Sequence, residues 1–105
     1  MTRPNLGEVR AAAERGVREA AEHILEVARE NAPVDEGDLR SSGKVETSGT
    51  TATITFDEVY SLKQHEDMRL NHDTGGPKYL EKALGSEREQ ARKIIADNIR
   101  RALGG

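Results

Sequence analysis

The chain has 105 residues, the length of one ordinary domain, and carries no cysteine, which excludes a disulfide framework and any site that needs a thiolate. Its 16 basic and 19 acidic side chains are interspersed, so the formal net charge is −3 and no polybasic block is present to bind phosphates. No run of about 18 apolar residues occurs, and no apolar signal segment follows the N-terminus, so we expect a protein made and used in soluble form.

A long amphipathic helix is predicted over about residues 6–31. Apolar residues recur there at steps of three and four, with charged residues between them. Asn5 can cap the start of this helix, and Pro33 marks its end because the residue before a proline is pushed out of the helical region. Gly16 lies in the middle, where glycine costs about 1 kcal/mol relative to alanine. Two interpretations stay open for Gly16: close packing of another backbone, or simple tolerance.

A structural turn is predicted directly after this helix. Pro33 and Gly37 favour the backbone angles of a turn. The carboxylates of Asp35 and Asp38 can accept backbone N–H bonds there, and Arg40 can pair with either of them. We expect these five residues to stabilise the turn between the helix and the next element.

Two segments of strand composition flank the turn at residues 48–50. In the second segment apolar residues alternate with threonines, which predicts an antiparallel hairpin with one apolar face. The β-type pattern resumes at Val59–Leu62, so a third strand is expected to pair with the second. The hairpin and third strand occupy about residues 41–64, and the apolar face of the sheet consists of Ala52, Ile54 and Phe56.

Polar and turn-forming residues dominate positions 66–77 without sustained periodicity. We predict a long exposed loop there. A loop of this length in a small domain is more often functional than not. Contact with a neighbouring subunit is the role that we expect.

A helical region is predicted over about residues 78–103. Pro77 suits the start of a short first segment, and Gly85 permits a break after it. Ser86 and Glu89 have the spacing of a capping box, and a second long helix follows that ends at Gly104. The apolar face of this helix consists of Ala91, Ile94, Ile95, Asn98, Ile99 and Ala102.

These elements predict a single α+β domain over residues 1–105. We expect a small antiparallel sheet of about three to four strands packed with two long helices, one N-terminal and one C-terminal. Both helices are expected to cover the apolar face of the sheet. Because the chain has only three aromatic residues to bury, association with further copies would add stability.

Three segments in fixed order resemble a family of bacteriophage proteins. They are Ala32–Ser42 (APVDEGDLRSS), Tyr60–Glu66 (YSLKQHE) and Gly75–Leu84 (GGPKYLEKAL). Their order and spacing are similar to those of the tail-completion and neck proteins of siphophages, also called head-to-tail joining or minor capsid proteins. Glu36 stands where that family most often has threonine, and residues 61–63 depart from its pattern in detail.

The resemblance implies a structural virion protein. Members of the family have a sheet flanked by two helices and assemble as rings, commonly of six subunits, at the head-proximal end of the tail. The implied partners are further copies of the chain and the adjacent neck or tail-tube proteins, with DNA only passing through the channel and no membrane. The implied location is the neck or tail of the virion, after synthesis in the host bacterial cytoplasm. Whether this chain terminates the tail or joins it to the head stays open.

A subunit interface is predicted where the third strand gives way to the loop. Tyr60, Gln64, His65 and Glu66 are expected there to anchor the next subunit or to order the loop. The alternative is that Tyr60 belongs to the core and the other three cap the edge of the sheet. The third segment of the resemblance adds further residues to this predicted interface, namely Lys78, Tyr79 and Leu80.

Two chemical alternatives are disfavoured by residue spacing. His65, Glu66, His72 and Asp73 suit zinc by type, but neither His-x-x-x-His on a helix nor His-Glu-x-x-His occurs. Ser41–Ser42 and a histidine lack a Gly-x-Ser-x-Gly elbow and a hydrophobic framework that would exclude water. We therefore predict no enzyme activity, no catalytic residues, no metal ligands and no cofactor.

The rival hypothesis is a small cytosolic protein-binding or regulatory module whose helices dock on an unrelated partner. A metal-dependent enzyme that uses His65 and His72 is a remote third. The three hypotheses differ in measurable properties. A ring subunit forms a discrete multimer, a regulatory module stays a monomer or dimer, and a metalloenzyme retains stoichiometric metal.

Overall fold

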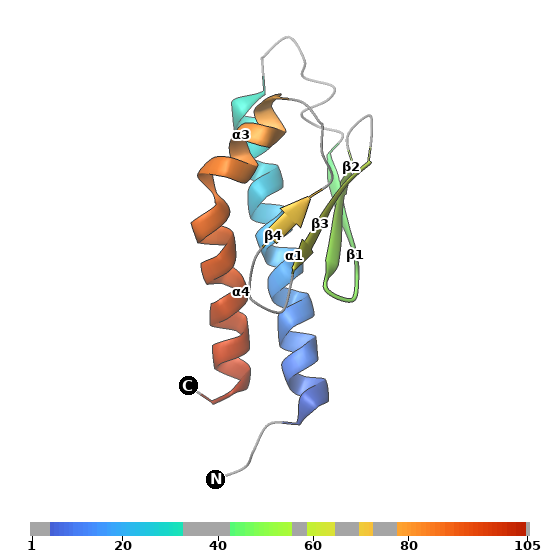
Figure 1. The fold of residues 1–105 in the computed structure, drawn as a ribbon, viewed down its shortest axis with the longest axis vertical. Helices are drawn as coiled ribbons and strands as arrows, with labels where there is room; N and C mark the ends of the chain where they lie inside the picture. The colour runs from blue at the N-terminus through green and yellow to red at the C-terminus, as the bar shows by residue number, and fades with distance from the viewer. Residues whose placement is uncertain (1–4, 33–42, 56–58, 65–69, 73–77, 105) are drawn as a thin grey trace.

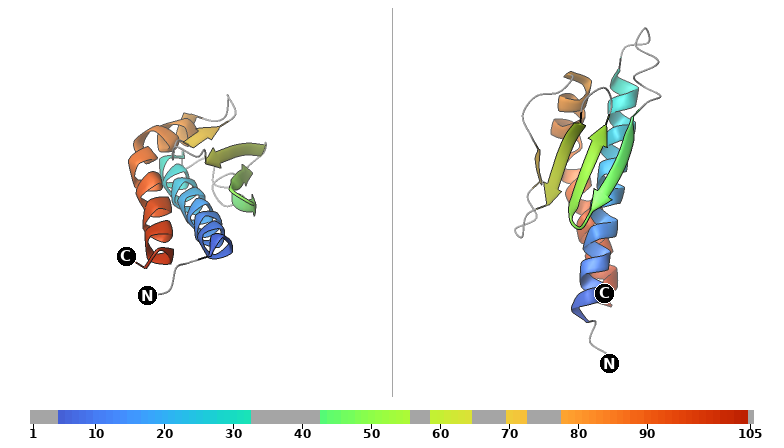
Figure 2. Two further views of the ribbon diagram at one scale, coloured as in Figure 1. Left: turned by 60° about the horizontal axis from the view of Figure 1, so that its bottom comes forward. Right: turned by 90° about the vertical axis from the view of Figure 1, so that its right-hand side faces the viewer.

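The computed structural model describes residues 5–32, 43–55, 59–64, 70–72 and 78–104. In this structure α1 lies between the sheet and α4. The fold therefore has three layers, which are α4, α1 and the sheet (Figures 1 and 2). The molecule is elongated, measuring 55 × 21 × 21 Å along its principal axes. The α+β class with an antiparallel sheet is confirmed. The elements are α1 (Leu6–Asn31), β1 (Lys44–Ser48), β2 (Thr51–Thr55), β3 (Val59–Gln64), β4 (Leu70–His72), α3 (Lys78–Ser86) and α4 (Arg88–Ala102).

Both ends of α1 form as the local sequence predicts. The Asn5 side chain accepts a hydrogen bond of 2.7 Å from the backbone N–H of Glu8, which satisfies one of the free donors of the first turn. At the other end Ala32 adopts the extended conformation, with φ −68° and ψ 143°. This is the conformation expected of a residue that precedes a proline, so the helix ends at Asn31.

α1 buries two faces, because it contacts α4 and α3 on one side and the first two strands on the other. The row Ala12, Gly16 and Ala20 recurs every four residues and therefore lies on one face. Leu6, which the periodicity assigns to the apolar face, is 87% exposed because α1 begins at the far end of the molecule from the sheet. The other buried residues of α1 are Val17, Ala21, Ile24, Leu25 and Ala28.

The sheet has the order β1-β2-β3-β4, with every neighbouring pair antiparallel. Gly49, at φ 60°, and Thr50 connect β1 to β2 in a two-residue turn, which suits the positive φ that glycine tolerates. Ala52 and Ile54 are fully buried, while the threonines that alternate with them in β2 are half-buried. The alternation of β2 therefore places its apolar face on α1 as predicted; Phe56 lies outside the described residues.

The sheet differs from expectation in two respects. A strand, β4, forms within the predicted loop of residues 66–77 by pairing Leu70–His72 with Leu62–Gln64 of β3. A strand of three residues is too short to give a periodic sequence pattern. It forms because its backbone pairs with the edge of β3. The two helices were also expected to cover the sheet together. Instead α1 covers it and α4 packs on the opposite side of α1 (Figure 2).

The C-terminal helical region divides after Ser86 rather than at Gly85. α3 continues through Gly85, and α4 begins after Glu87. The predicted capping box is wrong, because Glu87 is the N-cap residue and no side chain caps α4. The Ser86 hydroxyl instead donates a hydrogen bond of 3.0 Å to the Glu87 carboxylate. At the other end Gly104 has a φ of 86°, and α4 ends at Ala102.

Candidate interaction surface

α1 and α4 are in contact over much of their length, and this contact determines which face of α4 is exposed. The backbones approach closely at Gly16, where an added β-carbon would lie 2.9 Å from the Ile95 α-carbon and 3.3 Å from the Asn98 β-carbon. Of the two interpretations of Gly16, close packing of another backbone is therefore correct. Ala91 and Ile95 are fully buried on the same side of α4. This face of α4 is consequently turned toward α1.

Asn98 is a buried polar residue at the centre of this contact, with 1% of its surface exposed. Its side-chain oxygen accepts hydrogen bonds from Arg15 at 2.8 Å and from Arg101 at 3.1 Å. Its amide donates to the Glu19 carboxylate at 3.0 Å and to the Ile94 carbonyl at 2.9 Å. Because both ends of the amide are satisfied, the burial of Asn98 is compensated. The network also fixes the register of α4 on α1.

His23 and Glu87 join α1 to the junction between α3 and α4. The His23 Nε2 atom and the Glu87 Oε1 atom are 2.6 Å apart. The hydrogen bond to His23, together with the one from Ser86, holds the pKa of Glu87 below its ordinary value. At neutral pH Glu87 is therefore a carboxylate that accepts both hydrogen bonds.

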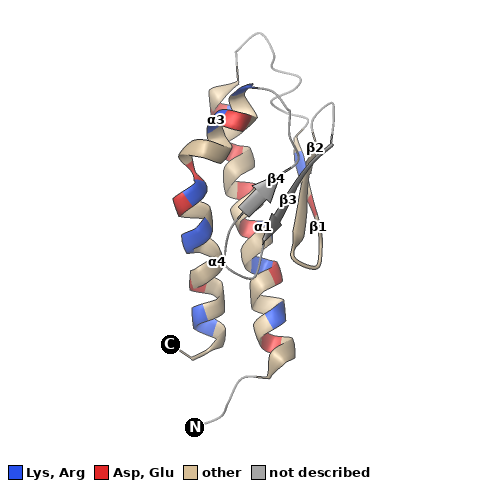
Figure 3. Cartoon of the chain, viewed as in Figure 1, with Lys and Arg blue, Asp and Glu red and all other residues tan. Residues whose placement is uncertain are grey.

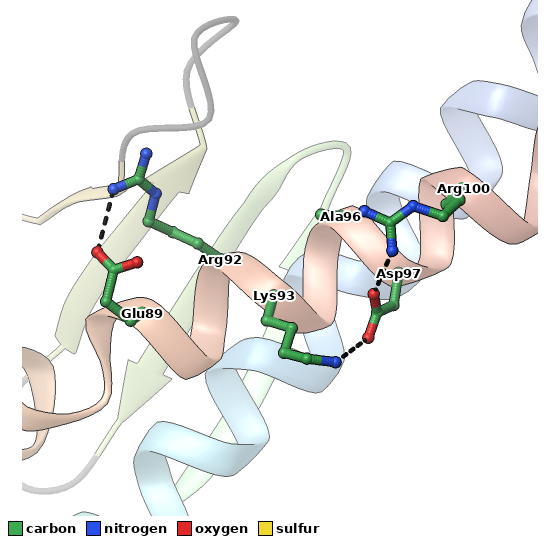
Figure 4. Close-up of a pocket in the computed structure, with 6 residues that line it drawn as sticks. All are labelled: Glu89, Arg92, Lys93, Ala96, Asp97 and Arg100. Carbon is green, nitrogen blue, oxygen red and sulfur yellow. Dashed lines mark hydrogen bonds and ion pairs between the residues drawn. The ribbon is translucent and has the colours of Figure 1, made fainter.

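The outer face of α4 carries a shallow hollow of about 370 Å³. The small side chain of Ala96 lies among the long charged side chains of this face (Figure 4). Asp97 pairs with Lys93 at 2.8 Å and with Arg100 at 2.9 Å, and the hydrogen bond from Lys93 keeps the pKa of Asp97 below its ordinary value. We call this surface the α4 outer face, and it consists of Glu89, Arg92, Lys93, Ala96, Asp97 and Arg100.

Charge is unevenly distributed between the two long helices. α4 holds five cationic side chains and two carboxylates. In contrast, residues 19–31 of α1 hold four carboxylates and one guanidinium group. In Figure 3 the ribbon of α4 has several blue Lys and Arg positions, and the half of α1 nearest α3 has red Asp and Glu positions.

The predicted subunit interface is described in part. Tyr60 and Gln64 lie on β3, whereas His65 and Glu66 lie outside the described residues. Lys78 is exposed at the start of α3. Two further residues, Tyr79 and Leu80, have 9% and 1% of their surfaces exposed and belong to the core of the chain. The interface stays a prediction. Of its three predicted residues in α3, Lys78 is the one that is exposed to solvent.

The predicted turn residues, Pro33, Asp35, Gly37, Asp38 and Arg40, all lie outside the described residues. At the edge of this segment the Arg29 guanidinium group donates a hydrogen bond to the Gly43 carbonyl, which ties the end of α1 to the start of β1.

The described residues offer neither a metal-binding cluster nor a membrane-spanning helix. Those residues contain no group of three or more histidine, cysteine or acidic side chains that would hold a metal ion. Among the same residues, no helix is both long and apolar enough to cross a bilayer.

Sequence reasoning missed the polar network and the α4 outer face. The sequence pattern places Asn98 on the apolar face of its helix but predicts no hydrogen-bond partner for it. Its partners Arg15 and Glu19 lie on α1. The partners of His23 and Asn98 are 64 and 83 residues away in sequence. Local spacing carries no signal over such separations. The excess of cations in residues 88–101 is a local signal that would have found the outer face.

Comparison with known families assigns the chain to a group of phage proteins. The sequence profile of the HK97-gp10-like family, described as "Bacteriophage HK97-gp10, putative tail-component", matches residues 5–92. This match spans α1, the sheet, α3 and the first turn of α4. No curated protein and no solved structure gives a significant match. The chain belongs to the HK97-gp10-like family of bacteriophage tail components.

Proposed function

We propose that the chain is a structural subunit that forms a ring at the head-proximal end of the tail of a long-tailed bacteriophage. The observation that carries this proposal is the family match over residues 5–92. The sequence resemblance to neck and tail-completion proteins supports the location and a ring of six copies. The proposed role requires no catalytic group, because the subunit acts through its contacts with other copies and with adjacent tail proteins.

The shape and surface of the chain are suited to repeated contacts. A narrow subunit 55 Å long offers a large lateral surface relative to its volume. The β1 strand lies at one end of the sheet order, so part of its backbone hydrogen-bonding capacity is free of described strands. Leu6 and Leu103 are 87% and 57% exposed and lie at the same end of the α1 and α4 pair (Figure 1). Exposed apolar groups and free strand edges both gain from burial in an assembly.

Light scattering after size exclusion, over a concentration series, tests the proposal. A discrete multimer that appears as rings by negative-stain electron microscopy is the expected result. A monomer or dimer at every concentration that also binds an unrelated host protein would favour the regulatory module. Replacing residues 66–69 and 73–77 with Gly and Ser residues, which keeps β4, tests whether those segments contribute to the ring contacts.

A further inference from the structure

The α4 outer face has the form of a groove for another helix. Arg92, Ala96 and Arg100 recur every four residues along one row, and Glu89, Lys93 and Asp97 recur along the next. Rows of this spacing are the ridges that helices use when they pack against one another. Ala96 is the small member of the first row, and Figure 4 shows long charged side chains around it, with ion pairs from Arg92 to Glu89 and from Arg100 to Asp97 joining the two rows.

This groove has more positive than negative charge. Lys93 and Arg100 share the single carboxylate of Asp97, while Arg92 pairs with Glu89 at 3.3 Å. These pairs lie within one exposed helix, where ion pairs contribute little to stability because water screens them. Their cations are therefore able to turn toward carboxylates of a molecule that docks in the groove.

α1 carries a ridge of complementary charge and spacing. Glu22, Glu26 and Glu30 recur every four residues, and all three are exposed. Within the described residues none of these carboxylates forms an ion pair. We call this row the α1 acidic ridge; it lies on the half of α1 that appears red in Figure 3.

We infer that the α4 outer face docks the α1 acidic ridge of a second copy of the chain. The two rows have the same spacing, so the ridge fits along the groove with Glu26 over Ala96 and cations on either side. Two helices whose four-residue rows interlock cross at about −50°. The ridge of the same chain cannot fill the groove, because α4 packs on α1 through its opposite face.

The contact joins two different surfaces of identical copies, so each copy has one groove and one ridge to offer. Such a heterologous contact repeats from copy to copy and closes into a ring when the rotation permits. The inference rests on the proposed function and names the side-chain contact through which the subunits meet. It also predicts that association weakens as ionic strength rises.

Charge reversal on each face gives a specific test. One variant carries Arg92→Glu and Arg100→Glu, and the other carries Glu22→Lys and Glu30→Lys. Each variant alone opposes like charges and is expected to self-associate at least about tenfold more weakly than the natural chain, by sedimentation velocity at low salt. A 1:1 mixture of the two variants restores association, because each then offers the surface that the other needs. The matched control is Arg10→Glu, an exposed charge in the first half of α1 that lies on neither surface.

Disulfide trapping gives a second measurement, because the natural chain has no cysteine. A chain with both Ala96→Cys and Glu26→Cys is expected to form a ladder of intermolecular disulfides on mild oxidation. A chain with Ala96→Cys and Ala11→Cys serves as the control, since Ala11 is exposed in the first half of α1 and lies outside the α1 acidic ridge. Circular dichroism establishes that each variant is folded before either measurement.

Three results would overturn the inference. Multimers that are unaffected by either charge reversal would place the subunit contact elsewhere and leave the proposed ring intact. A natural chain that stays monomeric, together with no ladder from the chain that carries Ala96→Cys and Glu26→Cys, would exclude the contact itself. Imaging of the virion would then decide whether the ring forms. Binding of a DNA duplex that is lost with Arg92→Glu and Arg100→Glu, without self-association, would assign the groove to a polyanion.

Discussion

Gly16 of α1 faces the backbone of Ile95 on α4 so closely that a β-carbon at Gly16 would lie 2.9 Å from the Ile95 α-carbon. The two helices are therefore packed backbone against backbone at this point, and no flexible side chain can move aside to make room. This approach also brings Asn98 within reach of Arg15 and Glu19.

Replacement of Gly16 by alanine is expected to destabilise the chain. Overpacking typically costs about 1–3 kcal/mol, and only about 1 kcal/mol of that is offset by the better helix propensity of alanine. Gly85→Ala is the matched control, because nothing lies within 4 Å of its added β-carbon and Gly85 is also helical. That change should stabilise the chain by up to about 1 kcal/mol in urea denaturation. Equal effects of the two substitutions would contradict the close approach.

Asn98→Ala is expected to lower the free energy of unfolding by about 1–3 kcal/mol, because the partners of a buried hydrogen-bonding group lose their bonds. The measurement is urea denaturation followed by circular dichroism. Asn31→Ala provides the comparison, since Asn31 is half-buried and makes no side-chain hydrogen bond within the described residues. A loss no larger than that of Asn31→Ala would show that the Asn98 network is dispensable.

The contact between His23 and Glu87 makes stability depend on pH. Its hydrogen bonds hold the pKa of Glu87 below the ordinary value of 4.5. Because the folded pKa is depressed, the stabilisation is fully present above about pH 4.5 and is lost as pH falls through the folded pKa. The natural chain should therefore lose more stability on acidification than Glu87→Gln, measured by thermal unfolding at several pH values. Glu22→Gln, which removes an exposed carboxylate, should retain the acid sensitivity of the natural chain.

Leu80 and Lys78 are neighbours in the predicted interface, yet they should respond differently to substitution. Leu80→Ala is expected to cost about 2–5 kcal/mol of stability, because Leu80 is 1% exposed in the core. Lys78→Glu should change stability by less than about 0.5 kcal/mol, as exposed substitutions usually do. If Lys78 contacts another subunit, the same change will weaken association in light scattering. A small effect of Leu80→Ala on unfolding would contradict the core assignment.

Strong local signals predicted the fold where they were available. Asn5 and the residue before Pro33 set the limits of α1, and the alternation of Ala52 and Ile54 with threonines set the buried face of β2. These features depend on a few adjacent residues, which is the range over which sequence patterns carry information. The break between α3 and α4 was misplaced because Gly85 is tolerated in a helix whose neighbours leave it space.

The arrangement of the helices and most of the candidate surface depend on contacts distant in sequence. α4 packs on α1 and not on the sheet, because the small residues Ala12, Gly16 and Ala20 form a row on which another helix fits closely. The apolar periodicity of α1 does not distinguish this row from the residues that face the sheet. The excess of cations in residues 88–101 indicates a charged face on α4, but only the structure shows that this face is left uncovered, because Ile95 and Asn98 pack against α1.

Cryo-electron microscopy of purified virions of the phage that encodes the chain would show whether and where copies of the chain assemble. We expect a closed ring of copies at the head-proximal end of the tail, with the α4 outer face of each copy against α1 of the next. Absence of the chain from the virion, or its presence as isolated copies without a ring, would contradict the account.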